Sequence, residues 1–363
     1  MKFPLLAAGA ALLFTSCQVP SKIALNGHGG RTAYNQTIQN TTNEQMLLNI
    51  VRLRYFDNPL FLDVSTVTSQ FTYRTHLDTS FKIPGFNERN PVGVGTGASW
   101  QNQPTIQYSP LEGRSFANQL MQPISLKTLQ QLVYTGWDID RLFRLVVQSI
   151  NDIPNAPLAA SPANEQLFDY EKFYEITSLF RYFQLQMQLQ IGLVALKSKE
   201  NGTHDAIQIS FPDGSEQAKR LAKLLGHETK ESNGRYVAQL ELGFNQKGQL
   251  GILPRSLLGC MYYASLGVDV PRCEVEQGNV QFPLVSDDDK YTWEKDLGSL
   301  LKIKFTFRDP VNAYVKVRYR NKWFYIDDTD LQSKKTFVLL QQLYSLQSIG
   351  VPQAPPILTI PIG

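Results

Sequence analysis

Apolar and polar residues alternate most regularly between Val67 and Tyr108. In the first arm of this segment, one set of alternate positions is largely apolar, and the other set, from Thr68 to Lys82, is polar throughout. The alternation resumes in a second arm after a break at Pro84 to Pro91. The more apolar set comprises Val67, Ser69, Phe71, Tyr73, Thr75, Leu77, Thr79 and Phe81, followed by Val92, Val94, Thr96, Ala98 and Trp100. A period of two indicates strands with two different faces, so we predict a long amphipathic β-hairpin over residues 60–110.

Two uses of this hairpin fit the pattern. Each arm reaches the length of about 9 to 11 residues that a tilted strand needs to cross a membrane. Insertion would require strands from further copies, because lipid cannot satisfy the backbone groups at the edges of a two-stranded sheet. The alternative is a hairpin that packs on the protein's own body and keeps one face in water, because antiparallel sheets of soluble proteins alternate in the same way.

The remaining N-terminal half has helical spacing. We predict a helix that opens at Asn43 and Glu44, carries apolar residues on one face up to Leu53 and is stopped by Asn58-Pro59. Residues 113–150 predict three short helices that Pro123 and Gly136 separate. The segment from Asn155 to Asn164 is rich in Pro and Ala and is the best candidate for a linker.

The C-terminal half mixes helices and strands. We predict a long helix from about Phe173 to Gln190 that Gly192 stops, although the alternation over Phe183–Gln190 would also suit a strand. The other predicted strands are 206–211, 236–242, 303–307, 313–319 and 323–326, with a tight turn at Asn321-Lys322, and the other predicted helices are 214–225, 255–266 and 333–346. The expected fold class is therefore α+β, with a helical N-terminal half that carries the long hairpin, and a mixed β-sheet with helices in the C-terminal half.

The N-terminus resembles a bacterial lipoprotein signal. Lys2 supplies a positive charge, Leu5 to Phe14 form a short apolar run, and the small residues Thr15 and Ser16 precede Cys17. The resemblance implies cleavage before Cys17 and acylation of its thiol and of the new amino group, although Phe14 stands where an aliphatic residue is usual. The alternative is an ordinary secretory signal followed by an incidental cysteine.

The signal and the composition shifts give an expected division of the chain. Because the residue after Cys17 is Gln18, whereas the inner-membrane retention signal has an Asp there, we expect an anchor in the outer membrane that faces the periplasm. The expected parts are the signal peptide 1–16, a tether 17–33, a helical region 34–154 with the hairpin, an α+β region 165–350 and an extended tail 351–363.

Four sequence strings resemble a known family. They are NEQMLLNIVRLRY at 43–55, QPTIQYSPL at 103–111, RSLLGCMYY at 255–263 and VRYRNKWFYIDD at 317–328. They are similar to an uncharacterised family of outer-membrane lipoproteins of Gram-negative bacteria, over most of the mature chain. The resemblance implies a location and one continuous fold. It transfers no catalytic residue, because no activity is established for that family.

Composition and cysteine content narrow the picture further. The chain has 363 residues, with 35 Lys and Arg against 32 Asp and Glu, so its charge is too balanced to indicate a nucleic-acid partner. Besides Cys17, it contains Cys260 and Cys273, which could form a disulfide in an oxidising periplasm. Alternatively, Cys260 is a buried helix residue and Cys273 an unpaired thiol.

The search for chemistry gives no catalytic, cofactor or metal site. Gly93 to Gly97 lacks the preceding strand and following helix of a dinucleotide loop. Asp287 to Asp289 lack the Gly turn of a calcium loop, and Asp327 to Asp330 lie where carboxylates cap a helix, which is the interpretation we prefer.

A second binding surface is suggested by Lys316, Arg318 and Arg320, which alternate with apolar residues and give one strand face a basic character. This basic face could bind lipid phosphates or an acidic partner, the acidic residues of 274–296 among them, or it could simply be solvated.

Together these observations predict a non-catalytic outer-membrane lipoprotein that acts as a scaffold or assembly component of the envelope. Its partners would be the lipid bilayer, through acylated Cys17, and envelope proteins or further copies of itself. The hairpin would serve either as an interaction element or as part of an oligomeric channel. The alternative is a periplasmic enzyme that acts on peptidoglycan or lipid with scattered carboxylates such as Glu112, Asp138 and Asp328.

Overall fold

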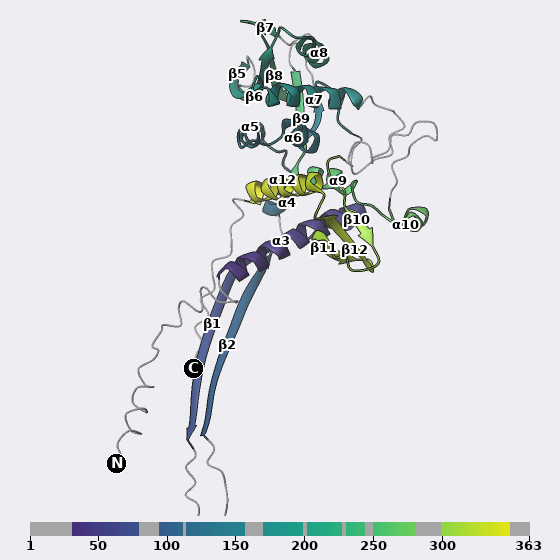
Figure 1. The fold of residues 1–363 in the computed structure, drawn as a ribbon. Helices are drawn as coiled ribbons and strands as arrows, with labels where there is room; N and C mark the ends of the chain where they lie inside the picture. Colours follow the sequence, from purple (N-terminus) through teal and green to yellow (C-terminus); the bar gives the residue numbers. More distant parts are fainter. Residues whose placement is uncertain are drawn as a thin grey trace, which may run out of the picture. The chain divides into compact units, whose positions relative to one another are not determined.

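The computed structural model describes residues 31–79, 94–111, 114–156, 170–198, 202–226, 230–243, 250–280 and 299–348. The fold class is α+β, as the hydrophobic pattern predicts (Figure 1). The chain divides into two compact units. The described part of the smaller unit comprises residues 31–42 and the hairpin, and the larger unit draws on both predicted regions, 34–154 and 165–350. The predictions for Cys17, Phe81, Val92, Glu112 and Asp287 to Asp289 fall outside the described residues, as does most of the predicted linker.

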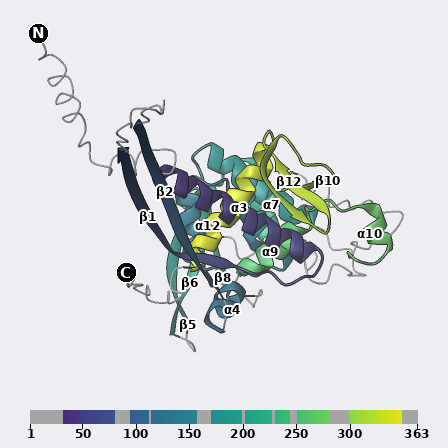
Figure 2. The same ribbon diagram turned by 90° about the horizontal axis from the view of Figure 1, so that it is seen from below.

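In the smaller unit, strand β1 (Leu62–Thr79) pairs with strand β2 (Val94–Pro110) in antiparallel fashion, and the two lie side by side in both ribbon views (Figures 1 and 2). The predicted long β-hairpin is therefore confirmed.

Helix α3 (Arg31–Arg54) begins earlier than the predicted start at Asn43 and ends before the predicted stop at Asn58-Pro59. Its first turns lack an apolar stripe, and the hydroxyl of Thr37 donates to the carbonyl of Ala33 at 2.8 Å. The helix ends in a Schellman motif, in which the amide of Asp57 donates to the carbonyl of Arg52 and the amide of Phe56 to that of Leu53. Phe56 therefore adopts a left-handed backbone with φ of 57°.

The three short helices predicted next are present as α4 (Arg114–Met121), α5 (Leu126–Tyr134) and α6 (Ile139–Val146). The side chain of Ser125 accepts from the Thr128 amide and caps α5, and Asp138 accepts from the Asp140 amide and caps α6. Helix α6 ends earlier than predicted, because Val147–Ile150 continue as strand β3 of a buried sheet, in which β-branched residues pack well.

Seven strands of the described residues form one sheet in the larger unit. The order is β4 (Ile153–Pro154), β3, β9 (Leu250–Pro254), β8 (Arg235–Leu242), β6 (Gly202–Pro212) and β5 (Gln190–Ser198), with β7 (Lys230–Ser232) also paired to β8. The pairing of β8 with β9 is parallel, whereas the other pairs are antiparallel. The turn between β7 and β8 is Asn233-Gly234, with positive φ at both residues, which suits the twist of a hairpin.

The prediction that the long helix reaches Gln190 is wrong, because the helix ends more than one turn earlier. Helix α7 (Glu171–Leu185) ends in a second Schellman motif, in which the amide of Gln188 donates to the carbonyl of Phe183. Met187 takes the left-handed position, with φ of 57°. Gly192 does not stop a helix but lies within β5, opposite Gln208.

The remaining elements follow the predicted order, apart from α10, which was not predicted. They are α8 (Glu216–Leu225), α9 (Leu257–Ser265), α10 (Arg272–Glu276), β10 (Lys304–Thr306), β11 (Ala313–Tyr319), β12 (Lys322–Asp327) and α12 (Leu331–Ser348). Strands β10, β12 and β11 form a three-stranded antiparallel sheet. Its tight turn is Arg320-Asn321 rather than Asn321-Lys322, since φ is 45° at Arg320 and 62° at Asn321. The strands β4, β5, β7 and β9 and the short helix α10 had not been predicted from the sequence.

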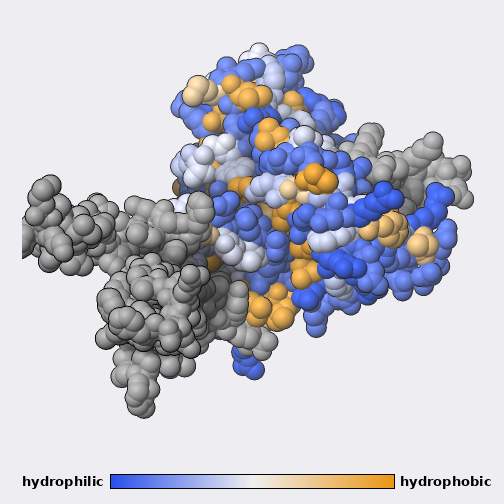
Figure 3. Space-filling view, turned by 60° about the horizontal axis from the view of Figure 1, so that its bottom comes forward, coloured by the Kyte–Doolittle hydropathy of each residue, from blue (hydrophilic) through white to orange (hydrophobic). Residues whose placement is uncertain are grey.

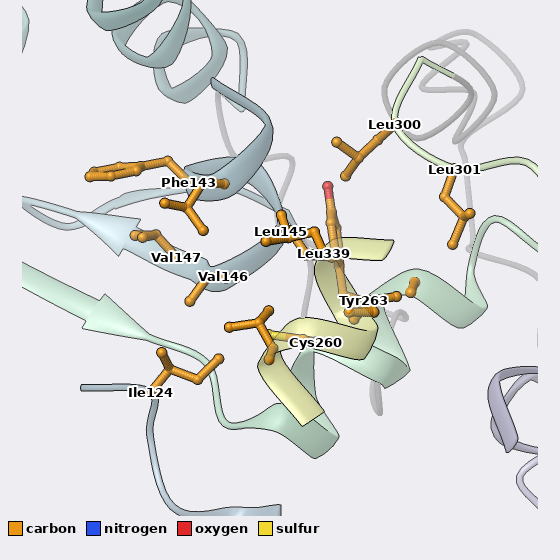
Figure 4. Close-up of a cluster of buried hydrophobic side chains, with 14 of the residues drawn as sticks. Ile124, Phe143, Leu145, Val146, Val147, Cys260, Tyr263, Leu300, Leu301 and Leu339 are labelled. Atoms are coloured by element: carbon orange, nitrogen blue, oxygen red, sulfur yellow. The ribbon is translucent and has the colours of Figure 1, made fainter. Parts of the chain in front are cut away.

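The helices and sheets of the larger unit share one hydrophobic core. Figure 4 shows part of it, where residues of α9 lie among side chains of α6, β3 and α12. A close approach occurs at Gly267, where a Cβ atom would lie only 2.4 Å from the carbonyl oxygen of Leu301. The surface is mostly hydrophilic on the face drawn in Figure 3, where apolar residues form separate small areas.

Candidate functional site

The two strands of the hairpin are in register along 17 residue pairs. Residues that lie directly opposite one another in an antiparallel pair belong to the same face of the sheet. Val67 lies opposite Ile106, and Tyr73 lies opposite Trp100. The predominantly apolar positions of β1 and β2 therefore coincide on one face, which we call the apolar face.

A β-bulge keeps the apolar face continuous. Val64 pairs with Tyr108 and Thr66 pairs with Gln107, so that Ser65 is the extra residue of β1. Without this extra residue, Val64 and Val67 would fall on opposite faces, because they differ by an odd number of positions.

The opposite face, which we call the polar face, has no apolar side chain at any described position. Its residues are Asp63, Thr66, Thr68, Gln70, Thr72, Arg74, His76 and Asp78 from β1, and Gly95, Gly97, Ser99, Gln101, Gln103, Thr105, Gln107 and Ser109 from β2. Every Asp, Arg and His residue of the two strands belongs to this face. The hairpin is therefore amphipathic along both of its described strands.

Both outer edges of the hairpin lack a partner strand among the described residues. With 18 residues, β1 is roughly 60 Å long at about 3.3 Å per residue. A lone two-stranded hairpin is at best marginally stable in water, and unpaired edges are templates for further strands. The geometry of the hairpin therefore favours pairing with other strands.

The chain enters and leaves the hairpin through fixed points of the larger unit. The Asn49 amide group donates to the carbonyl of Leu60 at 2.8 Å and accepts from the Leu60 amide at 3.0 Å. The amide of Leu111 donates to the carbonyl of Phe61 at 2.9 Å. The ring of Phe61 is buried and stacks on that of Tyr344, with 5.0 Å between centroids. These contacts hold the two residues that flank the strands.

A buried polar cluster forms around Tyr55, a few residues before β1 begins. The Tyr55 hydroxyl and the Lys322 ammonium group both donate to the carboxylate of Glu274, and all three residues are buried. Burial alone raises the pKa of Glu274, but the hydrogen bonds from Lys322 and Tyr55 outweigh it and leave the pKa below its ordinary value. Burial, together with the bond to Glu274, raises the pKa of Tyr55. The cluster joins the end of α3 to α10 and β12.

The predicted basic face is largely neutralised within the larger unit. Arg320 lies in the turn, donates to Asp57 at 3.0 Å and stacks over the ring of Tyr55 at 4.5 Å. Lys316 donates to Asp309 at 2.6 Å, and Arg318 is exposed. The acidic partners of Lys316 and Arg320 lie outside 274–296. Binding of lipid phosphates or of an acidic partner by this face stays a prediction.

The disulfide that we considered between Cys260 and Cys273 is absent, because both thiols are free. Cys260 is buried in α9 among apolar neighbours such as Val146, and Figure 4 shows it there. Its burial raises the pKa of the thiol to about 12. Cys273 is exposed on α10. The structure therefore matches the alternative of one core thiol and one surface thiol.

The two described carboxylates of the enzyme alternative have structural partners. Asp138 caps α6 and lies 3.3 Å from Arg181, and Asp328 accepts from Lys334 at 2.6 Å. No group of three or more His, Cys, Asp or Glu residues in the described part is placed to hold a metal ion.

The neighbouring carboxylates hold the start of α12. Asp330 accepts from the amide of Ser333 at 3.1 Å, as expected of a cap. Hydrogen bonds from Thr329, and then from Lys304, lower the pKa of Asp327 to about 2.

A buried arginine was missed by the sequence analysis. The Arg255 guanidinium donates to the carbonyls of Arg144, Leu145 and Val147 at 2.9 to 3.2 Å, and it stacks over Tyr263 at 4.1 Å. It thus satisfies carbonyls at the C-terminal end of α6, where a positive charge also complements the helix dipole. An isolated Arg before a helix gives no signal of this role.

Every helix within the described residues is too short or too polar to span a bilayer. Comparison with protein-family models, with curated proteins and with solved structures gives no match.

Proposed function

We propose that this chain is a non-catalytic lipoprotein of the outer membrane, anchored by acylated Cys17 on the periplasmic side. In this proposal it serves as a scaffold or assembly component of the envelope and contributes its β-hairpin to an oligomeric channel. The observation that carries the proposal is the separation of apolar and polar positions on two faces of a hairpin whose edges are both unpaired among the described residues.

Pairing between copies would satisfy both edges at once. Because β1 and β2 are antiparallel, β1 of one copy and β2 of the next can pair in the same sense and continue the sheet. Such contacts are head-to-tail, and repeated contacts of this kind close into a ring when the rotation per copy permits. The closed ring then has no free edge. Its apolar face suits contact with lipid, and its polar face suits a water-filled interior.

The roles of the carboxylates also favour a non-catalytic protein. Asp138 caps helix α6, and Asp328 forms an ion pair with Lys334, so both carboxylates have structural roles. The lipid anchor would hold each copy at the membrane, because two or more acyl chains give stable binding where one chain is marginal.

The oligomer is tested by mild-detergent extraction followed by size determination. The full mature chain should run as an oligomer, and a variant that lacks residues 64–108 should run as a monomer. Lys219→Gln, which removes one charge from an exposed position of α8, is the control and should keep the size of the wild type. If the wild type and the deletion variant both run as monomers, the channel is refuted.

The anchor is tested by Cys17→Ser. This variant should lose palmitate labelling and leave the membrane fraction, whereas Cys273→Ser, which alters the exposed thiol, should behave as the wild type. Unchanged labelling and fractionation of the Cys17 variant would remove the basis of the proposed location.

A further inference from the structure

Three of the four Asp, Arg and His residues on the described polar face gather toward one end of the hairpin. Arg74, His76 and Asp78 occupy three successive positions of this face in β1. Their register partners in β2 are Ser99, Gly97 and Gly95, which are among the smallest residues of the hairpin. We call the three β1 positions the charged tier. Each ionisable residue of the charged tier is thus paired with a Gly or Ser residue of β2.

The middle of the polar face has a different composition. From Thr66 to Thr72 and from Gln101 to Gln107, each of its positions holds Thr or Gln. The remaining charged position, Asp63, lies near the opposite end of β1. A neutral, hydrogen-bonding stretch therefore separates the charged tier from the other end of the face.

Assembly would repeat this tier around a ring. If each copy contributes one hairpin in the same register, the three positions recur at the same level in every copy. Rings of charged residues select ions in pores, acidic rings for cations and basic rings for anions. Each copy would contribute one basic residue, Arg74, and one acidic residue, Asp78, with His76 between them on the same face of β1.

We propose that Arg74 and Asp78 together set the ion selectivity of the assembled channel, with small inorganic cations and anions as the ligands of the charged tier. This inference rests on the proposed function, since the tier forms a ring only in the oligomer. Opposite charges in equal number leave the wild type with weak selectivity. Removal of either charge exposes the influence of the other.

The experiment measures the permeability of the purified full-length oligomer in planar lipid bilayers under a KCl gradient. Arg74→Gln leaves Asp78 unopposed and should raise the ratio of K⁺ to Cl⁻ permeability several-fold. Asp78→Asn leaves Arg74 unopposed and should lower the same ratio several-fold. Arg74→Lys retains the charge and should keep the ratio of the wild type. Lys219→Gln removes the same charge from α8 and should also leave the ratio unchanged.

A second measurement avoids any effect of these variants on assembly. His76→Cys in a Cys273→Ser background is assembled first and then treated with a positively or a negatively charged thiol reagent. The two reagents should shift the permeability ratio in opposite directions. Cys260 should not react in the folded protein, because it is fully buried.

The outcomes separate the two proposals. If the wild-type oligomer gives no conductance, the channel and the charged tier are both refuted. If it conducts, but Arg74→Gln, Asp78→Asn and the two reagents leave the permeability ratio unchanged or shift it in one direction, the charged tier is refuted and the channel stands.

Discussion

Lys322 should be one of the most sensitive positions of the larger unit. Its ammonium group is bonded to the carboxylate of Glu274, and each side chain is only 11% exposed. In Lys322→Met the carboxylate loses its counter-charge but stays buried, with Tyr55 as its remaining side-chain donor. Breaking one side of a buried ion pair costs about 3 to 5 kcal/mol of unfolding free energy. We expect about 3 kcal/mol here, since the pair keeps some contact with water.

A double-mutant cycle separates the interaction from the loss of side-chain packing. Glu274→Gln retains an acceptor for Tyr55 but leaves Lys322 without its counter-charge. The double variant contains neither charge, so it should be less destabilised than the sum of the single variants, by about 2 kcal/mol. Lys219→Met, in the exposed pair with Glu216, serves as the control and should have a much smaller effect.

The same pair should make stability depend on acidity. The pKa of Glu274 lies lower in the folded protein than its ordinary value of 4.5. A carboxylate of this kind stabilises the fold above its unfolded pKa, and the stabilisation is lost as the pH falls through the folded pKa. Below about pH 4.5, the wild type should therefore lose stability that Glu274→Gln does not lose.

Urea denaturation of the mature chain in mild detergent, followed by tryptophan fluorescence, gives the unfolding free energies at each pH. A coupling energy within about 0.5 kcal/mol of zero, which is the usual error of additivity, would contradict the buried pair. An identical pH dependence of the wild type and Glu274→Gln would contradict the lowered pKa of Glu274.

Three further predictions concern single residues. Gly267→Ala should destabilise the protein by about 2 kcal/mol in urea denaturation, because the new Cβ would lie 2.4 Å from the carbonyl oxygen of Leu301; full stability would contradict this close approach. Met187→Gly should stabilise the protein by about 0.5 to 1 kcal/mol in the same assay, because it relieves a left-handed backbone with φ of 57°, and a destabilised variant would refute the strain. In the native protein a thiol reagent should label Cys273 and spare Cys260, which mass spectrometry of digested protein can check; rapid labelling of both would contradict the burial of Cys260.

The hairpin could be predicted from the sequence because its signal is local. A strand exposes its alternation in consecutive residues, so both arms were visible without knowledge of the rest of the chain. The shift from even-numbered Val64 to odd-numbered Val67 was also visible, but only the register assigns it to a bulge at Ser65. The three helices of 113–150 were predictable for a similar reason, because Pro123 and Gly136 mark their ends.

The polar cluster was beyond prediction because its members are distant in sequence. Tyr55, Glu274 and Lys322 are brought together by the fold, and each alone has the sequence context of a surface residue. The end of α7 was predicted wrongly for another reason. Left-handed residues after a helix are usually Gly, so Met187 gives no sequence signal of a helix end, whereas Gly192 gives a misleading one.

The faces and the edges of the hairpin differ in how far the sequence specifies them. Residue type specifies the faces of a strand, because burial or exposure acts on side chains, and here the two faces differ at nearly every described level. The edges consist of backbone groups that every residue possesses, so no residue type states which strand will pair there. The sequence therefore specifies the two faces but not the strand that would pair at each edge. Comparing the size of the chain with and without residues 64–108 tests whether these edges mediate the proposed assembly, because the deletion removes both edges and leaves the rest of the chain in place.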